Sequence, residues 1–179
     1  MRVISGKYRG KKLKEFELST TKPTTDRVKE SIFNLIQFDV MDAVVLDLFA
    51  GTGALGIEAI SRGAKKTYLV DNNSQAISII KDNTKNFTED FEVVNKSALE
   101  FLRASKTKFD IILLDPPYKS NFGMECINYI INNNLLNENG IIIFETARDL
   151  NFDFNHSNFK LTTHNYGTVA VHKLVKLWK

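Results

Sequence analysis

From residue 43 onward, short apolar runs alternate with amphipathic stretches. The apolar runs show little internal alternation, which is typical of strands covered by helices on both faces of a parallel sheet. The stretches between them carry apolar residues at helical spacing. Strand–helix alternation of this length predicts right-handed βαβ units and a doubly wound α/β fold. The predicted strands cover 43–49, 66–70, 91–95, 109–114 and 140–145, and the predicted helices cover 53–62, 73–86, 97–103 and 121–134.

Two more strands are predicted near the end of the chain. Residues 159–165 and 169–177 flank the turn sequence Tyr166-Gly167-Thr168. This arrangement predicts an antiparallel hairpin that closes one edge of the sheet and brings the strand number to seven.

The first 40 residues follow a different pattern. Residues 1–18 alternate weakly around two glycines, which indicates a twisted hairpin or an ordered arm. A helix is predicted after Pro23, because Thr24-Thr25-Asp26 can cap free N–H groups. One apolar face follows, made of Val28, Ile32, Leu35 and Ile36. We therefore divide the chain into an N-terminal extension, 1–40, and a main domain, 41–179.

Charge is distributed unevenly over the 179 residues. The net charge is only +3, yet residues 1–31 hold nine Lys/Arg against four Asp/Glu. A basic segment on a near-neutral body suggests a polyanion partner, and a solvated arm without a partner is the alternative. The single Cys126 excludes an internal disulfide and favours a reducing, cytoplasmic location. No apolar run approaches the ~20 residues that span a bilayer.

A glycine-rich loop follows the first predicted strand, in the sequence Asp47-Leu-Phe-Ala-Gly51-Thr-Gly53-Ala-Leu-Gly56. Its glycines match the dinucleotide spacing, and Asp71 follows twenty residues after Gly51, where an acid can bind ribose hydroxyls. A carboxylate at Asp47 would repel pyrophosphate but attract an ammonium or sulfonium group. The loop therefore suits S-adenosylmethionine better than NAD. A plain β–α turn with Asp47 as a loop-tying carboxylate is the alternative.

A second motif, Asp115-Pro116-Pro117-Tyr118, follows the strand predicted at 109–114. Ligands of open α/β sheets bind beyond the carboxyl ends of strands, so this motif and the glycine loop are expected together. Two prolines remove two N–H donors and leave the Asp115 carboxylate and the Pro116 carbonyl as acceptors. Two acceptors suit an exocyclic –NH2, and Tyr118 can stack on the base that carries it. A rigid turn without a ligand is the alternative.

The two loops together resemble the class I methyltransferases that modify exocyclic amino groups. The runs Ile4–Leu13 and Lys22–Asn34 narrow the resemblance to the RsmD family, bacterial small-subunit rRNA guanine-N2 methyltransferases. The resemblance covers nearly the whole chain. It implies a class I, Rossmann-like fold, S-adenosylmethionine as cofactor, and the N2 amine of a guanine in 16S rRNA as target, within a 30S subunit or an assembly intermediate.

The resemblance also implies site residues. It places Asp115, Pro116, Pro117 and Tyr118 at the target base. Family members usually carry an acid near the adenine amino group after the third strand, where this chain has Ser97. The implied cofactor contacts are Asp47, Phe49, Ala50, Gly51, Gly53, Asp71, Asn72, Ser97 and the Ala98 backbone.

RNA phosphates are expected at the basic N-terminal segment, through Arg2, Lys7, Arg9, Lys11, Lys12 and Arg27. Arg27, Lys29 and Glu30 are expected on the polar side of the first helix, in contact with RNA, with cofactor or with water only.

Other functions stay open at this point. Methyltransferases of DNA adenine or cytosine, tRNA guanine or protein glutamine are alternatives, and several of them carry Asn at the position of Asp115. An NAD enzyme is disfavoured by Asp47, and an idle RNA-binding assembly factor by the intact 115–118 motif. His156, His164 and His172 lack ligand spacing, so no metal site is predicted.

Overall fold

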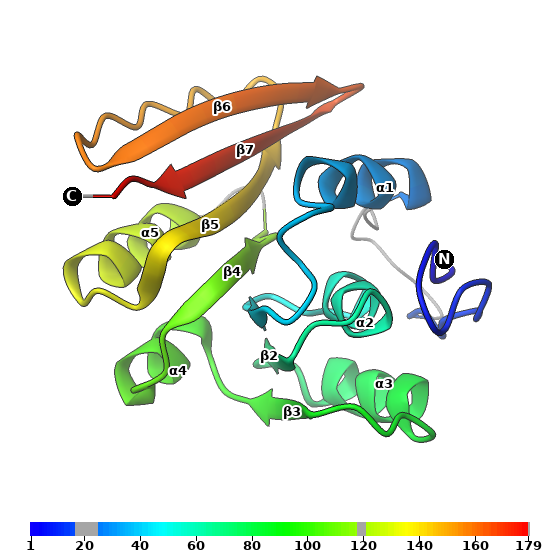
Figure 1. The fold of residues 1–179 in the computed structure, drawn as a ribbon. Helices are drawn as coiled ribbons and strands as arrows, with labels where there is room; N and C mark the ends of the chain where they lie inside the picture. The colour runs from blue at the N-terminus through cyan, green and yellow to red at the C-terminus, as the bar shows by residue number, and fades with distance from the viewer. Residues whose placement is uncertain (17–24, 118–120, 179) are drawn as a thin grey trace.

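Helices and strands alternate along the chain in the computed structural model, which describes residues 1–16, 25–117 and 121–178 (Figure 1). Within these residues the helices are α1 (Asp26–Leu35), α2 (Ala54–Ser61), α3 (Ser74–Thr84), α4 (Ala98–Ala104) and α5 (Phe122–Asn132). The strands are β1 (Val44–Asp47), β2 (Lys66–Asp71), β3 (Phe91–Asn95), β4 (Phe109–Leu114), β5 (Leu136–Ala147), β6 (Phe159–Tyr166) and β7 (Val169–Lys176).

All seven strands form one sheet in the order β3-β2-β1-β4-β5-β7-β6. The first five strands of that order pair in parallel, and β7 pairs antiparallel with both β5 and β6. The chain order reverses between β1 and β4, so a crevice is expected beyond the carboxyl ends of these two strands. The predicted doubly wound sheet and its terminal hairpin are both confirmed.

Two helical layers cover the sheet (Figure 1). Helices α1, α2 and α3 lie on one face, where Ile32, Leu55 and Ile80 belong to the buried clusters. Helices α4 and α5 lie on the other face, where Leu102 and Ile127 are buried against the sheet. Burial on both faces explains why β1 and β4 read as continuous apolar runs.

The observed element ends follow local chemistry. Helix α1 begins after Thr25, whose side chain accepts a hydrogen bond from the Val28 N–H. Helix α3 begins after Asn73, which caps the Gln75 N–H in the same way. The largest difference from prediction is β5, which starts at Leu136 rather than at residue 140: Leu136 pairs with Phe109 of β4, and an irregularity in register follows before Ile141 pairs with Ile111.

The N-terminal loop, residues 1–16, is ordered but is not a regular hairpin. A single isolated bridge joins Arg2 and Lys12, and Gly6 and Gly10 turn the chain with φ values of 83° and 85°. Val3 and Leu13 are buried in the cluster that also contains residues of α2 and α3. The loop is therefore part of the packed domain.

Cys126 is fully buried on α5, and burial raises the pKa of its thiol to about 12. Across the described ranges, no helix has the length and apolar character needed to cross a membrane.

Candidate active site

The glycine loop lies at the carboxyl end of β1 and is tied to the end of β2. Gly51 and Gly53 have φ values of 54° and 84°, in the left-handed region that glycine adopts without strain. The Gly51 N–H donates to Asp71 Oδ2 at 2.8 Å, and the Ala50 N–H donates to the Val70 carbonyl at 3.0 Å. A Cβ on Gly51 would meet no atom within 4 Å, so this backbone faces open space. Such a loop lets a ligand approach the main chain closely.

Asp47 is the last residue of β1 and is almost completely buried, with 1% of its surface exposed. Its Oδ2 accepts from the Gly56 N–H at 2.8 Å and so holds the start of α2. Its Oδ1 is buried and has no hydrogen-bond partner among the residues that the structure describes. The pKa of Asp47 is raised to about 7, mainly by burial; the charges of Asp115 and Asp71 act in the same direction, and the Gly56 hydrogen bond opposes them. The loop-tying role is therefore visible directly, and one oxygen remains for another donor.

Asp115 reaches the same edge of the sheet from β4. Strand β4 runs parallel to β1 with Asp47 beside Leu113, so Asp115 follows two residues later, directly after the end of β4. This register brings the two carboxyls to neighbouring strand ends, and the charge of Asp115 contributes to the raised pKa of Asp47. Pro116 is buried and Pro117 is exposed. Tyr118 falls outside the described residues.

Ser97 lies at the N-terminus of α4, beyond the end of β3. Its hydroxyl donates to Glu100 Oε2 at 2.6 Å, and the Ser97 N–H donates to the same oxygen at 3.0 Å. The two residues form a capping box, and the hydrogen bonds from Ser97 lower the pKa of Glu100. A carboxylate, that of Glu100, therefore lies beside position 97, where the resemblance implies an acid. The Ser-x-x-Glu spacing in the sequence is the signal that could have identified Glu100.

The other predicted cofactor residues are distributed around the glycine loop. Phe49 is half-buried and packs against the α4–α5 side of the sheet, whereas Ala50 is buried on the α2–α3 side. Asn72 is exposed directly after Asp71, and Ala98 is half-buried at the start of α4. All of them follow the carboxyl ends of β1, β2 and β3.

The N-terminal loop is anchored to α2 by one buried carboxylate. The Ile4 and Ser5 N–H groups donate to Glu58 Oε2 and Oε1 at 2.8 and 3.0 Å. Tyr8 stacks on Phe87 with 3.8 Å between ring centroids and 3° between planes. The loop therefore presents its basic side chains from a fixed backbone.

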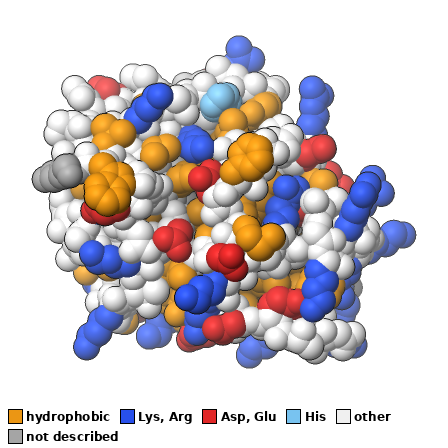
Figure 2. All heavy atoms as spheres, viewed as in Figure 1, with side chains coloured by type: hydrophobic (Ala, Val, Ile, Leu, Met, Phe, Trp, Pro, Cys, Tyr) orange, Lys and Arg blue, Asp and Glu red, His pale blue; other side chains and the backbone are white. Residues whose placement is uncertain are grey.

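Those basic side chains differ in whether an acidic or aromatic side chain already contacts them. Lys7 pairs with Glu89, and the Lys11 ammonium lies 5.4 Å from the Phe87 ring centroid. Arg2 is exposed with its Nε 3.9 Å from Asp26. No ion pair is found within the described ranges for the exposed residues Arg9, Lys12 and Arg27. Lys and Arg side chains gather on the side of the molecule where Figure 1 places the N-terminal loop (Figure 2).

Lys29 is not on the polar side of α1, as the sequence had suggested. It is completely buried, its Nζ lies 3.4 Å from Glu58 Oε2, and it donates to the Arg2 carbonyl at 2.5 Å. Burial lowers the pKa of Lys29, and the charge of Glu58 opposes this effect. Sequence periodicity placed Lys29 on the polar side of the helix because its partner Glu58 lies on another helix and leaves no local signal.

Similarity to known proteins agrees with this geometry. Residues 1–175 match the family model described as "Conserved hypothetical protein 95". The chain is 37% identical over 154 residues to "Ribosomal RNA small subunit methyltransferase D" of Haemophilus influenzae, covering 83% of this chain and 80% of that protein. The chain belongs to the RsmD family.

Other members of the RsmD family match along the whole chain. The Bacillus subtilis protein named "Putative rRNA methyltransferase YlbH" is 39% identical over 181 residues, covering 97% of this chain and 98% of the relative. The solved structure of "Putative methyltransferase yhhF from Escherichia coli" superimposes with a TM-score of 0.89 at 32% identity, over 100% of this chain and 99% of that one. The fold is that of class I methyltransferases.

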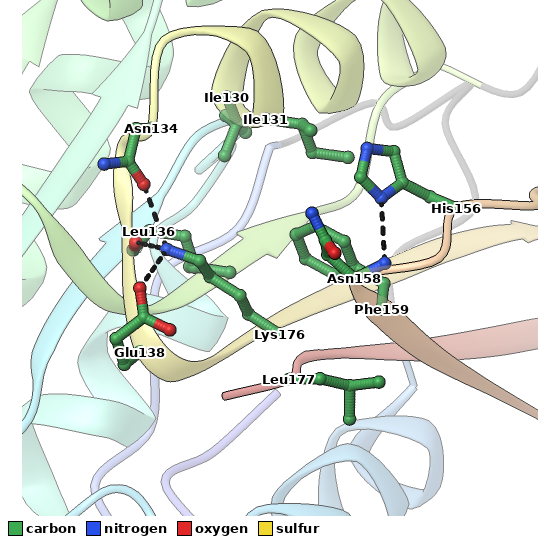
Figure 3. Close-up of a pocket in the computed structure, with 10 residues that line it drawn as sticks. All are labelled: Ile130, Ile131, Asn134, Leu136, Glu138, His156, Asn158, Phe159, Lys176 and Leu177. Atoms are coloured by element: carbon green, nitrogen blue, oxygen red, sulfur yellow. Dashed lines mark hydrogen bonds and ion pairs between the residues drawn. The ribbon is translucent and has the colours of Figure 1, made fainter. Parts of the chain in front are cut away.

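A cavity of about 330 Å³ lies elsewhere in this RsmD-family chain (Figure 3). It opens where β5 begins and β7 ends, at the edge opposite to Asp47 and Asp115. Lys176 lines it and is engaged by Glu138 at 2.8 Å, Asn134 Oδ1 at 2.9 Å and the Leu136 carbonyl at 3.1 Å. None of the predicted site residues lines this cavity. Among the residues that are described, no cluster of three His, Cys, Asp or Glu could hold a metal ion.

Proposed function

We propose that this protein transfers a methyl group from S-adenosylmethionine to the exocyclic N2 amine of a guanine in 16S rRNA. The observation that carries the proposal is the convergence of Asp47 and Asp115 at the carboxyl ends of two adjacent parallel strands. The relative in H. influenzae carries the name of a small-subunit ribosomal RNA methyltransferase, which supports the substrate class. We further infer a cytoplasmic location and a 30S subunit or assembly intermediate as the substrate particle.

The glycine loop fits S-adenosylmethionine. The buried Oδ1 of Asp47 can accept a hydrogen bond, and an ionised Asp47 favours a cationic ligand over a pyrophosphate. Gly51 and Gly53 allow close approach of the main chain. When bound, this cofactor supplies an electrophilic methyl group. The residues that would hold it are Asp47, Phe49, Ala50, Gly51, Gly53, Asp71, Asn72, Ser97 and Ala98, with Glu100 added beside Ser97.

The chain's own contribution to the chemistry is to bind and orient the amine. The guanine N2 lone pair is delocalised into the ring, which makes the amine a poor nucleophile. Hydrogen bonds from the amine to the Asp115 carboxylate and the Pro116 carbonyl favour a more pyramidal nitrogen and stabilise the positive charge that develops on it. Pro117 and Tyr118 complete the proposed base site, and the product nitrogen loses its proton to Asp115 or to water.

The N-terminal extension, 1–40, is proposed as the RNA contact of a methyltransferase domain, 41–179. A base inside a duplex cannot reach such a site, so the target guanine is expected to be unpaired or flipped out. Arg2, Lys7, Arg9, Lys11, Lys12 and Arg27 are the proposed phosphate contacts. Of these, Arg9, Lys12 and Arg27 are the exposed side chains for which the described residues supply no acidic partner.

Transfer of labelled methyl groups tests the proposal. The protein is incubated with labelled S-adenosylmethionine and with 16S rRNA, 30S particles, DNA or protein, and the product is digested to nucleosides. We expect label in N2-methylguanosine from 16S rRNA or the 30S particle. Label only in DNA, in protein or in another nucleoside would contradict the assignment.

Substitution of Asp115 tests the proposed mechanism. We expect Asp115→Ala to lower the methylation rate by two orders of magnitude or more, because it removes an acceptor that acts on developing charge. Cofactor affinity, measured by calorimetry with S-adenosylhomocysteine, should stay within about twofold of the wild type. Asp153→Ala, at an exposed position after β5, is the matched control and should leave both values unchanged. Wild-type turnover by Asp115→Ala would remove Asp115 from the mechanism.

A further inference from the structure

One buried amide side chain connects the N-terminal loop to the glycine loop. Asn83 lies near the end of α3 and is 3% exposed. Its Oδ1 accepts from the Lys14 N–H at 2.8 Å, and its Nδ2 donates to the Lys14 carbonyl at 3.3 Å. The same Nδ2 donates to the Thr52 carbonyl at 3.1 Å. One residue therefore binds two segments that are about forty residues apart in the sequence.

Each of the two segments has a proposed ligand. Thr52 lies between Gly51 and Gly53, whose left-handed conformations form the loop assigned to the cofactor. Lys14 ends the stretch that carries the exposed residues Arg9 and Lys12. The glycine loop also rests on α3 directly, since a Cβ on Gly53 would lie 3.1 Å from Ile80 Cγ1. Asn83 and α3 therefore form a continuous contact between the N-terminal loop and the glycine loop.

We propose that Asn83 is a positioning residue that couples RNA binding by the N-terminal loop to cofactor binding by the glycine loop. This inference rests on the proposed function, because it requires both an RNA and a cofactor. RNA phosphates bound by the loop stabilise the arrangement seen in the structure, in which both Lys14 backbone groups are paired with Asn83. The paired amide then has its Nδ2 directed at the Thr52 carbonyl. Because coupling between two binding sites is reciprocal, bound cofactor strengthens RNA binding by the same factor.

The alternative anchors of the loop do not make this connection. Glu58 binds the Ile4 and Ser5 N–H groups, and Ser61 Oγ donates to the Ser5 carbonyl. Both side chains belong to the second half of α2, away from Thr52. Asn83 is the side chain for which hydrogen bonds to both loops are found within the described residues.

Calorimetry with S-adenosylhomocysteine, with and without 16S rRNA, tests the coupling. For the wild type we expect saturating RNA to tighten binding of this ligand by fivefold or more, within the range typical of coupled sites. For Asn83→Ala we expect the factor to fall below twofold. Asn86→Ala, at an exposed position just beyond α3, is the matched control and should keep the wild-type factor. An unchanged factor in Asn83→Ala overturns the proposal.

A second variant separates coupling from folding. Asn83→Asp is isosteric, keeps an acceptor for the Lys14 N–H and removes the hydrogen bonds donated to the Lys14 and Thr52 carbonyls, so at pH 8 it tests the Thr52 connection while one of the two Lys14 contacts is retained. We expect it to lose the coupling factor as well. In methylation assays both variants should raise KM for S-adenosylmethionine several-fold and leave kcat unchanged, because Asn83 does not touch reacting atoms. A parallel fall in kcat would overturn the positioning role.

Failure of the coupling and failure of the proposed function give different results. If the wild type binds RNA and methylates it but its cofactor affinity does not respond to RNA, the coupling is wrong and the function stands. If the wild type neither binds nor methylates RNA, the proposed function is wrong and the coupling falls with it.

Discussion

At the residue scale, Asp47 combines an oxygen with a structural role and an oxygen proposed to bind the cofactor in one side chain. Oδ2 fixes the start of α2 through the Gly56 N–H. Burial, with Asp115 and Asp71 nearby, raises the pKa of Asp47 to about 7, so near neutral pH its carboxyl is divided between protonated and ionised forms. A cation bound beside Oδ1 would favour the ionised form and lower this pKa again.

Replacement of Asp47 by Asn is expected to change folding stability and cofactor affinity in opposite directions. A carboxyl whose folded-state pKa is raised above the unfolded value of 3.8 makes the protein less stable as pH rises from about 4 to about 7. Asp47→Asn keeps an acceptor for Gly56 and removes this loss. We expect the variant to be more stable at pH 8 by about 1–4 kcal/mol in urea unfolding, with little difference at pH 4.

The same variant should bind cofactor more weakly. At pH 8 we expect at least a tenfold loss of affinity for S-adenosylmethionine, because the amide carries no negative charge. Wild-type affinity should itself decline as pH falls below about 7. Equal stability of the two proteins from pH 4 to pH 8 would show that Asp47 titrates normally.

At the element scale, α1, α2 and the N-terminal loop meet at one buried ionic group. Glu58 on α2 accepts from Ile4, Ser5 and Arg62, and it pairs with Lys29 of α1. Glu58 and Lys29 are both completely buried. Removing one partner leaves an uncompensated charge, which costs far more than a surface pair is worth.

Glu58→Gln should therefore lower the free energy of unfolding by about 3–5 kcal/mol. The variant is expected to unfold at a lower urea concentration than the wild type. The double variant Glu58→Gln with Lys29→Met removes the stranded ammonium and should recover part of this loss. Glu138→Gln, which breaks the partly exposed pair with Lys176, is the control and should cost less than about 1 kcal/mol. A Glu58→Gln effect no larger than the control would mean that the cluster does not anchor the loop.

At the scale of the whole molecule, the sheet was predictable because its signals are local. The apolar runs of β1 and β4 reflect burial on both faces, and Gly167 marks the β6–β7 turn with a φ of 62°. The juxtaposition of Asp47 and Asp115 was also predictable, since the carboxyl ends of parallel strands share an edge.

What the sequence did not reveal depends on partners far along the chain. Lys29 looks polar until Glu58, on another helix, is packed against it. Asn83 has no local signature, because its partners Lys14 and Thr52 belong to two distant loops. The start of β5 at Leu136 was missed because Leu136 pairs with Phe109 of β4 across an irregularity in register that separates it from the apolar run 141–144.

Salt dependence of RNA binding tests the proposed RNA surface as a whole. Each lost phosphate contact lowers the slope of log affinity against log salt by roughly 0.7–0.9. We expect Arg9→Glu and Lys12→Glu each to reduce the slope by about that amount and to weaken binding to many RNA sequences alike. Lys160→Glu, at an exposed position on β6, is the control and should leave the slope unchanged. Unaltered slopes in both loop variants would place the RNA elsewhere.

The reactivity of Cys126 measures how often α5 separates from the sheet. The chain has one sulfhydryl, which is shielded on every side in the native state and holds its proton at physiological pH. A thiol-reactive dye should therefore label the protein only while α5 is detached from the sheet. Labelling rates compared with and without RNA and cofactor would then show whether ligands at the carboxyl ends of the strands slow this detachment, with no engineered probe.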